Sequence, residues 1–124
     1  MGNEKINNFY DLEAWTRAHQ LALNVYKATK NFPRDELFGI TNQLRRAATS
    51  VSANISEGFN RFHFNDKIRF YHMARGSVGE VQNFLILAKD LGFIEPKNLE
   101  EFMQKTNETK KLINGLISSI EKQK

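Results

Sequence analysis

The chain contains no cysteine, only two prolines and no long apolar run, and these absences exclude several classes of protein. Without cysteine there can be no disulfide framework, no thiolate metal site and no cysteine nucleophile. The longest apolar run is the five residues 84–88, whereas a membrane-spanning helix needs about 20. The polar N-terminus does not resemble a signal peptide. We therefore expect a cytoplasmic protein that does not enter a membrane and whose fold rests on packing.

Residues that carry catalysis or bind metals are also sparse. The histidines His19, His63 and His72 are dispersed, and the chain lacks the Glu-x-x-His pairs of di-iron helical bundles. The segment 76–79 contains two glycines but lacks the strand, turn and lysine of a phosphate-binding loop. We therefore expect no catalytic residues, no metal site and no cofactor, and a protein that is not an enzyme.

Apolar residues recur at spacings of three and four, which is typical of helices with one face turned toward a core. The chain has 124 residues, a common size for one domain, so we expect a single domain over residues 1–124. The spacing predicts helices over about residues 12–31, 35–58, 65–91 and 97–121. Connections of about five residues favour antiparallel neighbours. The sequence therefore predicts an all-α protein, an antiparallel up-down-up-down four-helix bundle.

Four residues indicate where these helices begin and end. Asp35 and Asn65 are suitable N-caps for the second and third helices, because their side chains can accept an unpaired backbone N–H. Gly58 and Gly92 are suitable stops for the same two helices.

The third predicted helix carries a second apolar stripe beside its first one. This stripe comprises Phe70, Met73, Ser77, Glu80, Phe84, Leu87 and Leu91. So wide an apolar face has two interpretations: a central helix covered on most sides by its own chain, or a helix that partly contacts another subunit. We favour the second interpretation and expect an oligomer.

Small, polar and charged residues mix at core-facing positions of residues 43–58, and the third helix contains Gly76 and Gly79. Helical glycines usually permit the close approach of a neighbour. We therefore expect a buried polar network in which Arg45 or Arg46 pairs with Glu57 or Glu80. Its candidate members are Arg45, Arg46, Asn54, Glu57, Ser77 and Glu80. The alternative is a ligand pocket built from the same groups.

Positive charge is concentrated between residues 45 and 75. This stretch holds six basic and two acidic residues, and the resulting excess of four equals the net charge of the whole chain, +4. At the turn near residues 61–67, basic residues alternate with aromatic ones, which suits phosphate contact combined with base stacking. The candidate nucleic-acid-binding residues are Arg61, Lys67, Arg69, Arg75, Phe62 and Phe64.

Seven short motifs together resemble a known family. They are residues 11–15 (DLEAW), 32–33 (FP), 43–48 (QLRRAA), 54–58 (NISEG), 69–70 (RF), 76–80 (GSVGE) and 91–94 (LGFI). In this order and spacing, over about residues 9–120, the chain resembles the four-helix-bundle proteins of the 23S rRNA intervening-sequence family. The resemblance implies a homopentameric ring and a reading frame of the type found within intervening sequences of bacterial ribosomal RNA genes. A related family, the accessory proteins of diversity-generating retroelements, shares the bundle and works with a reverse transcriptase and RNA.

The leading functional hypothesis is a non-enzymatic homo-oligomer that binds RNA or DNA through a basic surface, because symmetry multiplies a modest charge. The runner-up is a protein adaptor or scaffold, for example for a polymerase or reverse transcriptase, whose arginines form internal ion pairs. A third and distant hypothesis is an enzyme with a pocket around Glu57 and Glu80. Whether the arginines are exposed or buried distinguishes the first two hypotheses.

Overall fold

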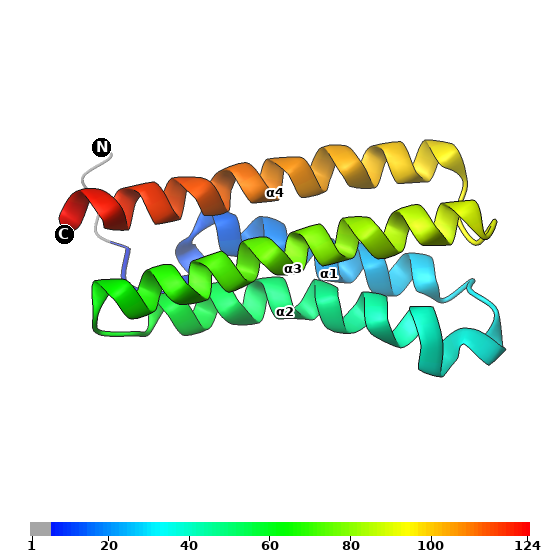
Figure 1. Ribbon diagram of the computed structural model, residues 1–124, viewed down its shortest axis with the longest axis horizontal. Coiled ribbons are helices and arrows are strands. Elements are labelled where there is room, and N and C mark those ends of the chain that lie inside the picture. The colour runs from blue at the N-terminus through cyan, green and yellow to red at the C-terminus, as the bar shows by residue number, and fades with distance from the viewer. Residues whose placement is uncertain (1–5) are drawn as a thin grey trace.

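The computed structural model describes residues 6–124 and has four long helices (Figure 1). These are α1 (Glu13–Thr29), α2 (Asn42–Phe59), α3 (Phe64–Asp90) and α4 (Pro96–Gln123). A short 3-10 helix, η1 (Phe9–Asp11), precedes α1. Consecutive helices run in opposite directions and pack against one another in chain order (Figure 1). The all-α prediction with four sequentially packed helices is therefore confirmed.

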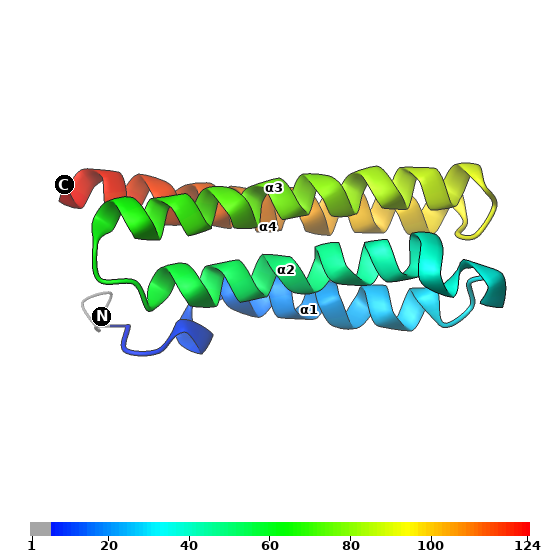
Figure 2. The same ribbon diagram turned by 60° about the horizontal axis from the view of Figure 1, so that its bottom comes forward.

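The helices form two layers, with α3 and α4 stacked on α1 and α2 (Figure 2). The α2–α3 turn and the C-terminus lie at one end of the bundle, and the other two connections lie at the opposite end (Figure 1). Within residues 6–124, no helix is both long and apolar enough to cross a membrane.

The core follows the predicted spacing of three and four. In α1, for example, Ala18, Ala22, Val25 and Thr29 are all buried. The buried apolar residues form two clusters, one toward each end of the bundle. The largest side chains with almost no exposure are Leu21, Leu44, Ile55, Leu85 and Ile113. Packing of these one-sided helices is what holds the elements together, since the chain has no disulfide.

The start of the second helix differs from the prediction of a helix from residue 35. Residues Arg34–Glu36 form a 3-10 turn, Leu37–Thr41 form a π-helical turn, and regular α-helix begins only at Asn42. Gly39 interrupts the helical backbone with φ −107° and ψ −119°. Apolar spacing did not reveal this change because it indicates which side chains face the core and does not report the backbone conformation at Gly39.

Three of the four predicted helix-end signals act differently in the structure. Asp35 lies within the 3-10 turn, and α3 begins at Phe64 with His63 at its N-cap, so neither Asp35 nor Asn65 caps a helix. The helix α2 continues past Gly58 to Phe59. Gly92 acts as predicted: it follows Leu91, the C-cap of α3, and has φ +80°, a conformation that glycine adopts at little cost.

Candidate nucleic-acid interface

The α2–α3 turn presents an aromatic side chain to solvent. Phe62 is 88% exposed and Phe64 is 37% exposed, although both are large apolar residues. The ring of His63 lies edge-on to that of Phe62, with 5.1 Å between the ring centres. Phe62 is therefore free to stack on a ligand, whereas Phe64 is only partly so.

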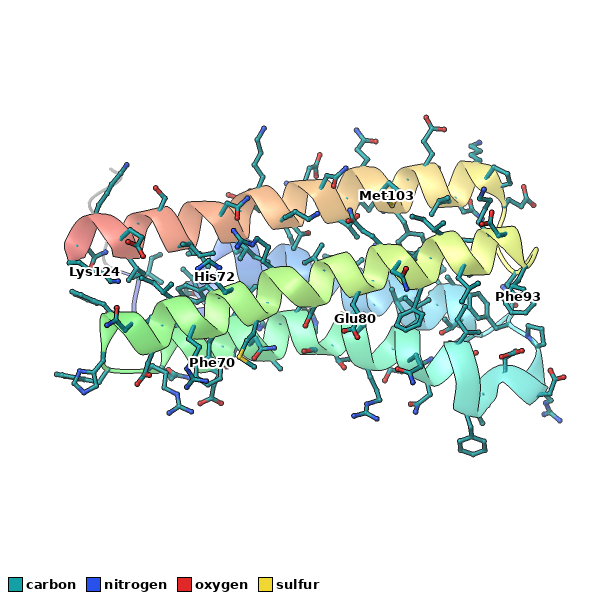
Figure 3. The ribbon with its side chains drawn as sticks, viewed as in Figure 1. Phe70, His72, Glu80, Phe93, Met103 and Lys124 are labelled. Atoms are coloured by element: carbon teal, nitrogen blue, oxygen red, sulfur yellow. The ribbon has the colours of Figure 1, made fainter. Side chains whose placement is uncertain are left out.

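Two arginines of the basic cluster lie beside this turn and contact the same aromatic ring. The guanidinium carbons of Arg61 and Arg69 lie 4.7 and 4.5 Å from the ring centre of Phe70. Figure 3 shows Phe70 on α3 near the turn. Arg61 also pairs with Glu57 at 2.9 Å, and Arg69 lies 3.9 Å from Asp66. Both ion pairs are exposed, and exposed pairs contribute about 0 to 1 kcal/mol to stability.

Lys67, by contrast, is used within the fold. Its ammonium group donates a hydrogen bond of 2.7 Å to the backbone carbonyl of Phe59, at the C-terminus of α2, and lies 5.5 Å from the Phe59 ring centre. Partial burial removes water from the charged group and lowers the pKa of Lys67. A cation at a helix C-terminus also interacts favourably with the helix dipole. Lys67 thus fastens the start of α3 to the end of α2.

Arg75 is directed toward α4 and lies apart from the turn. Its guanidinium donates to the side-chain oxygen of Asn114 at 2.8 Å, and its other terminal nitrogen lies 2.8 Å from Nδ1 of His72. Of the six predicted binding residues, the structure therefore gathers Arg61, Phe62 and Arg69 at one end of the bundle and leaves Arg75 outside that group.

Two of the six expected members of the polar network, Asn54 and Ser77, are linked between α2 and α3 through Ser50. The hydroxyl groups of Ser50 and Ser77 lie 2.9 Å apart, and the side-chain amide of Asn54 donates to the Ser50 hydroxyl at 3.0 Å. Ser77 is 8% exposed, so the contact crosses the helix interface away from bulk water. The sequence named Asn54 and Ser77 but missed Ser50, which lies one helical turn before Asn54.

The expected ion pairs of this network do not form. Arg45 donates through Nε to the hydroxyl of Thr29 at 2.8 Å, and within residues 6–124 it makes no salt bridge. Arg46 is exposed, and Glu57 pairs with Arg61 instead. Glu80 lies at the surface near the middle of α3 (Figure 3). Helical spacing placed Glu80 beside apolar residues. It could not predict how far around α3 the neighbouring helices extend, and therefore whether they cover Glu80.

The two glycines of α3 also differ from expectation. A Cβ added to Gly76 or Gly79 would meet nothing within 4 Å, so no neighbour in the described chain needs their small size. The close approach occurs instead at Gly58, where a Cβ would lie 2.8 Å from the Tyr71 ring and 3.1 Å from the Lys67 carbonyl oxygen.

The second stripe of α3 is mostly uncovered in the single chain. Met73, Leu87 and Leu91 are 47%, 43% and 51% exposed, and Glu80 lies among them. Ser77 is the one buried member. The helices of the chain therefore cover the first stripe and leave an apolar strip on the outer side of α3, which Ser77 and Glu80 interrupt.

Polar contacts that the sequence did not predict join α3 and α4. The side-chain amide of Gln82 donates to Thr106 and Asn107 at 2.9 Å each, and Lys110 donates to its oxygen at 3.2 Å. Thr106 is fully buried, as its position in an apolar stripe predicts. Within the described residues, no three histidine, aspartate or glutamate side chains gather as metal ligands.

Residues 10–115 match the protein family described as 23S rRNA-intervening sequence protein. The chain belongs to this family. The match spans most of the chain and confirms the resemblance carried by the seven motifs. No curated protein matches the chain.

Among solved structures, the fold of this family member is similar to that of a protein from Bacteroides thetaiotaomicron VPI-5482, described as a protein of unknown function from the S23 ribosomal protein family. The TM-score is 0.78 at 22% sequence identity, and the similarity covers 85% of this chain and 95% of the other. At this identity the likeness establishes the fold alone.

Proposed function

We propose that this 23S rRNA-intervening sequence protein is a non-enzymatic, homo-oligomeric binding protein that contacts single-stranded RNA or DNA through its α2–α3 turn. The observation that carries the proposal is the side chain of Phe62, which is 88% exposed and follows Arg61 directly in the turn, while the guanidinium groups of Arg61 and Arg69 both lie against the ring of Phe70. Burial of an aromatic ring is favourable, so a ring left in water at the tip of a turn suits a partner that stacks on it.

The arginines at the turn suit phosphate contact. Their planar guanidinium groups lie against Phe70, which limits the freedom that they would lose on binding. Their partners Glu57 and Asp66 are at the surface, so exchanging each exposed ion pair for a phosphate costs little. Base stacking on Phe62 would add about 1 to 3 kcal/mol, and it requires an unpaired base.

Oligomer formation is the second part of the proposal. It is supported by the apolar strip on α3, because exposed apolar patches usually mark interfaces. Each of the two uncovered helical glycines costs about 1 kcal/mol relative to alanine, a cost that a closely packed second copy would offset. A pentameric ring is the size that the family resemblance implies. Each added copy brings another pair of turn arginines to the assembly.

The experiment is a salt titration of binding to fluorescent single-stranded and duplex RNA of equal length. We expect affinity to fall steeply with salt, because each neutralised phosphate releases counterions, and single strands to bind more tightly than duplex. Phe62→Ala should remove the preference for single strands, and Arg69→Glu should weaken both forms. Lys67 is unsuitable for charge reversal because it supports the end of α2.

Lys111→Glu is the matched control, because Lys111 is exposed on α4 and makes no salt bridge within residues 6–124. It changes the net charge as much as Arg69→Glu does and should affect binding less. Absence of binding at about 50 mM salt, or equal effects of the two charge reversals, would contradict the proposed site.

A protein adaptor is the second candidate function, and a specific observation favours it. Several arginines contact side chains of their own chain: Arg61 pairs with Glu57, Arg75 binds Asn114, and Arg45 binds Thr29. Such an adaptor would contact a polymerase or reverse transcriptase through the apolar strip on α3, the surface that is proposed above for contact between copies of the chain. If RNA does not bind, the adaptor function would be supported by a polymerase or reverse transcriptase that binds the wild type and does not bind Leu87→Glu.

A further inference from the structure

A pocket of about 530 Å³ opens where α1 ends and the second helical segment begins, at the end of the bundle opposite the α2–α3 turn (Figure 1). Three cationic side chains line it, from Lys30, Arg34 and Arg45. No carboxylate is among its lining residues, although Asp35 and Glu36 follow Arg34 directly in the chain. Its volume falls within the range of about 300 to 1,000 Å³ that is usual for small-molecule sites.

Arg45 is held in place but has no anionic partner. Its Nε donates to the hydroxyl of Thr29 at 2.8 Å, and its guanidinium carbon lies 4.7 Å from the centre of the Tyr26 ring. These contacts fix the orientation of the side chain, while no hydrogen bond occupies its two terminal nitrogens within residues 6–124. A partly buried guanidinium held in this way is prepared to bind an anion through two parallel hydrogen bonds.

The other basic residues of the pocket are equally unpaired. Within the described part of the chain, neither Lys30 nor Arg34 forms a salt bridge. Lys30 and Arg34 are exposed, so both are accessible to an anion that enters the pocket beside Arg45.

One residue that lines the same pocket, Thr41, carries an unsatisfied buried hydroxyl group. Thr41 is 3% exposed, and its Oγ1 is the one buried side-chain polar atom in residues 6–124 with no hydrogen-bond partner. Buried hydroxyl groups are nearly always paired, and an exception indicates a missing partner. Thr41 lies at the end of the segment Leu37–Thr41, in which Gly39 interrupts the helical backbone.

We propose that this pocket binds a small phosphorylated molecule of about nucleotide size. The phosphate would lie against Arg45, with Lys30 and Arg34 beside it, and the side chains of Phe32 and Leu37 would contact its apolar part. A phosphate monoester carries a charge of about −1.5 to −2, which suits a site with three cations better than a single carboxylate does. The site does not depend on the proposed nucleic-acid function, because it shares no residue with the α2–α3 turn.

The test is isothermal titration calorimetry of the full chain with adenosine monophosphate and inorganic pyrophosphate. Adenosine and citrate are the comparison ligands, since one lacks the phosphate and the other carries carboxylates. We expect both phosphate compounds to bind, adenosine not to bind, and citrate to bind more weakly. Arg45→Gln should weaken binding at least about tenfold, as expected for loss of a charge-assisted pair of hydrogen bonds.

Arg46→Gln is the matched control, because it removes the same charge from the neighbouring residue, whose side chain is exposed and does not line the pocket. It should change affinity less than about twofold, since exposed charges act weakly at a distance in salt. Should Arg45→Gln not fold, Lys30→Gln/Arg34→Gln replaces it, because both side chains are exposed and neither forms a salt bridge within residues 6–124. Equal losses in the Arg45 and Arg46 variants, preference for citrate, or no binding of either phosphate compound at millimolar concentration would overturn the proposal.

Discussion

At the scale of single residues, Tyr71 is the titratable group that its surroundings change most. Its ring is 2% exposed and packs against Gly58, and burial raises the pKa of Tyr71 to about 12, from 10 in water. The folded protein therefore holds this phenol proton more tightly than the unfolded chain does. The stability that follows is fully present below pH 10 and is lost as the pH rises toward 12.

We predict that Tyr71→Phe leaves the free energy of unfolding nearly unchanged at pH 7. Between pH 10 and 12, the variant should lose about 2 kcal/mol less of this free energy than the wild type does. Urea unfolding at several pH values measures this difference. Tyr10→Phe is the control, because Tyr10 is 55% exposed. The same alkaline loss in wild type and Tyr71→Phe would show that another group is responsible.

Glu80 illustrates how exposure decides the contribution of a charged residue. The sequence places it in an apolar stripe, where loss of a buried ion-pair partner would cost about 3 to 5 kcal/mol. In the structure Glu80 is exposed, and within residues 6–124 it makes no salt bridge. We therefore predict that Glu80→Ala changes the stability of the dissociated chain by less than about 0.5 kcal/mol. Thermal unfolding at high dilution is the measurement, and a loss of several kcal/mol would restore the ion-pair hypothesis.

At the scale of helices, the contact between α2 and α3 depends on the absence of a side chain at Gly58. An added Cβ would lie 2.8 Å from the Tyr71 ring and 3.1 Å from a backbone oxygen of α3, and backbone cannot move aside cheaply. We predict that Gly58→Ala destabilises the protein by about 1 to 3 kcal/mol through overpacking, although alanine is the better helix former. Denaturant unfolding checks the sign and size of the change.

Gly115→Ala in α4 is the control for that experiment, because a Cβ there would meet nothing within 4 Å. It should stabilise the helix by about 0.5 to 1 kcal/mol. If Gly58→Ala were also stabilising, α2 and α3 could move apart at Gly58 without loss of stability, which would contradict the prediction.

At the scale of the whole molecule, the proposed assembly depends on the outer side of α3. We predict that light scattering gives a mass several times 14.4 kDa for the wild type. Leu87→Glu should return it to a folded monomer, because an unpaired charge is costly to bury against apolar side chains. Leu23→Glu on α1 is the control, since Leu23 is also exposed but lies on a different helix. A monomeric wild type at micromolar concentration would contradict this prediction.

Helical spacing predicted the four helices, because burying a helix requires one apolar face whatever its neighbours are, whereas three of the four helix-end residues acted differently. The prediction was weaker wherever a result depended on which helices meet. Asn54 and Ser77 join across α2 and α3, but the ion pairs expected of Arg45 and Glu80 do not form. Spacing along one helix gives the side of a residue relative to its own axis and says nothing about the distance to another chain segment.

The sequence by itself therefore determined the all-α class, the number of long helices, their antiparallel order and the family, since these follow from local periodicity, short connections and motifs. Only the tertiary structure decided that Lys67 fastens one helix to the next, that Gly58 rather than Gly76 permits a close approach, and that Arg45 lies in a basic pocket without an acidic partner. Each of these contacts joins residues from different elements, and its energy depends on distances of a few ångströms that packing alone sets.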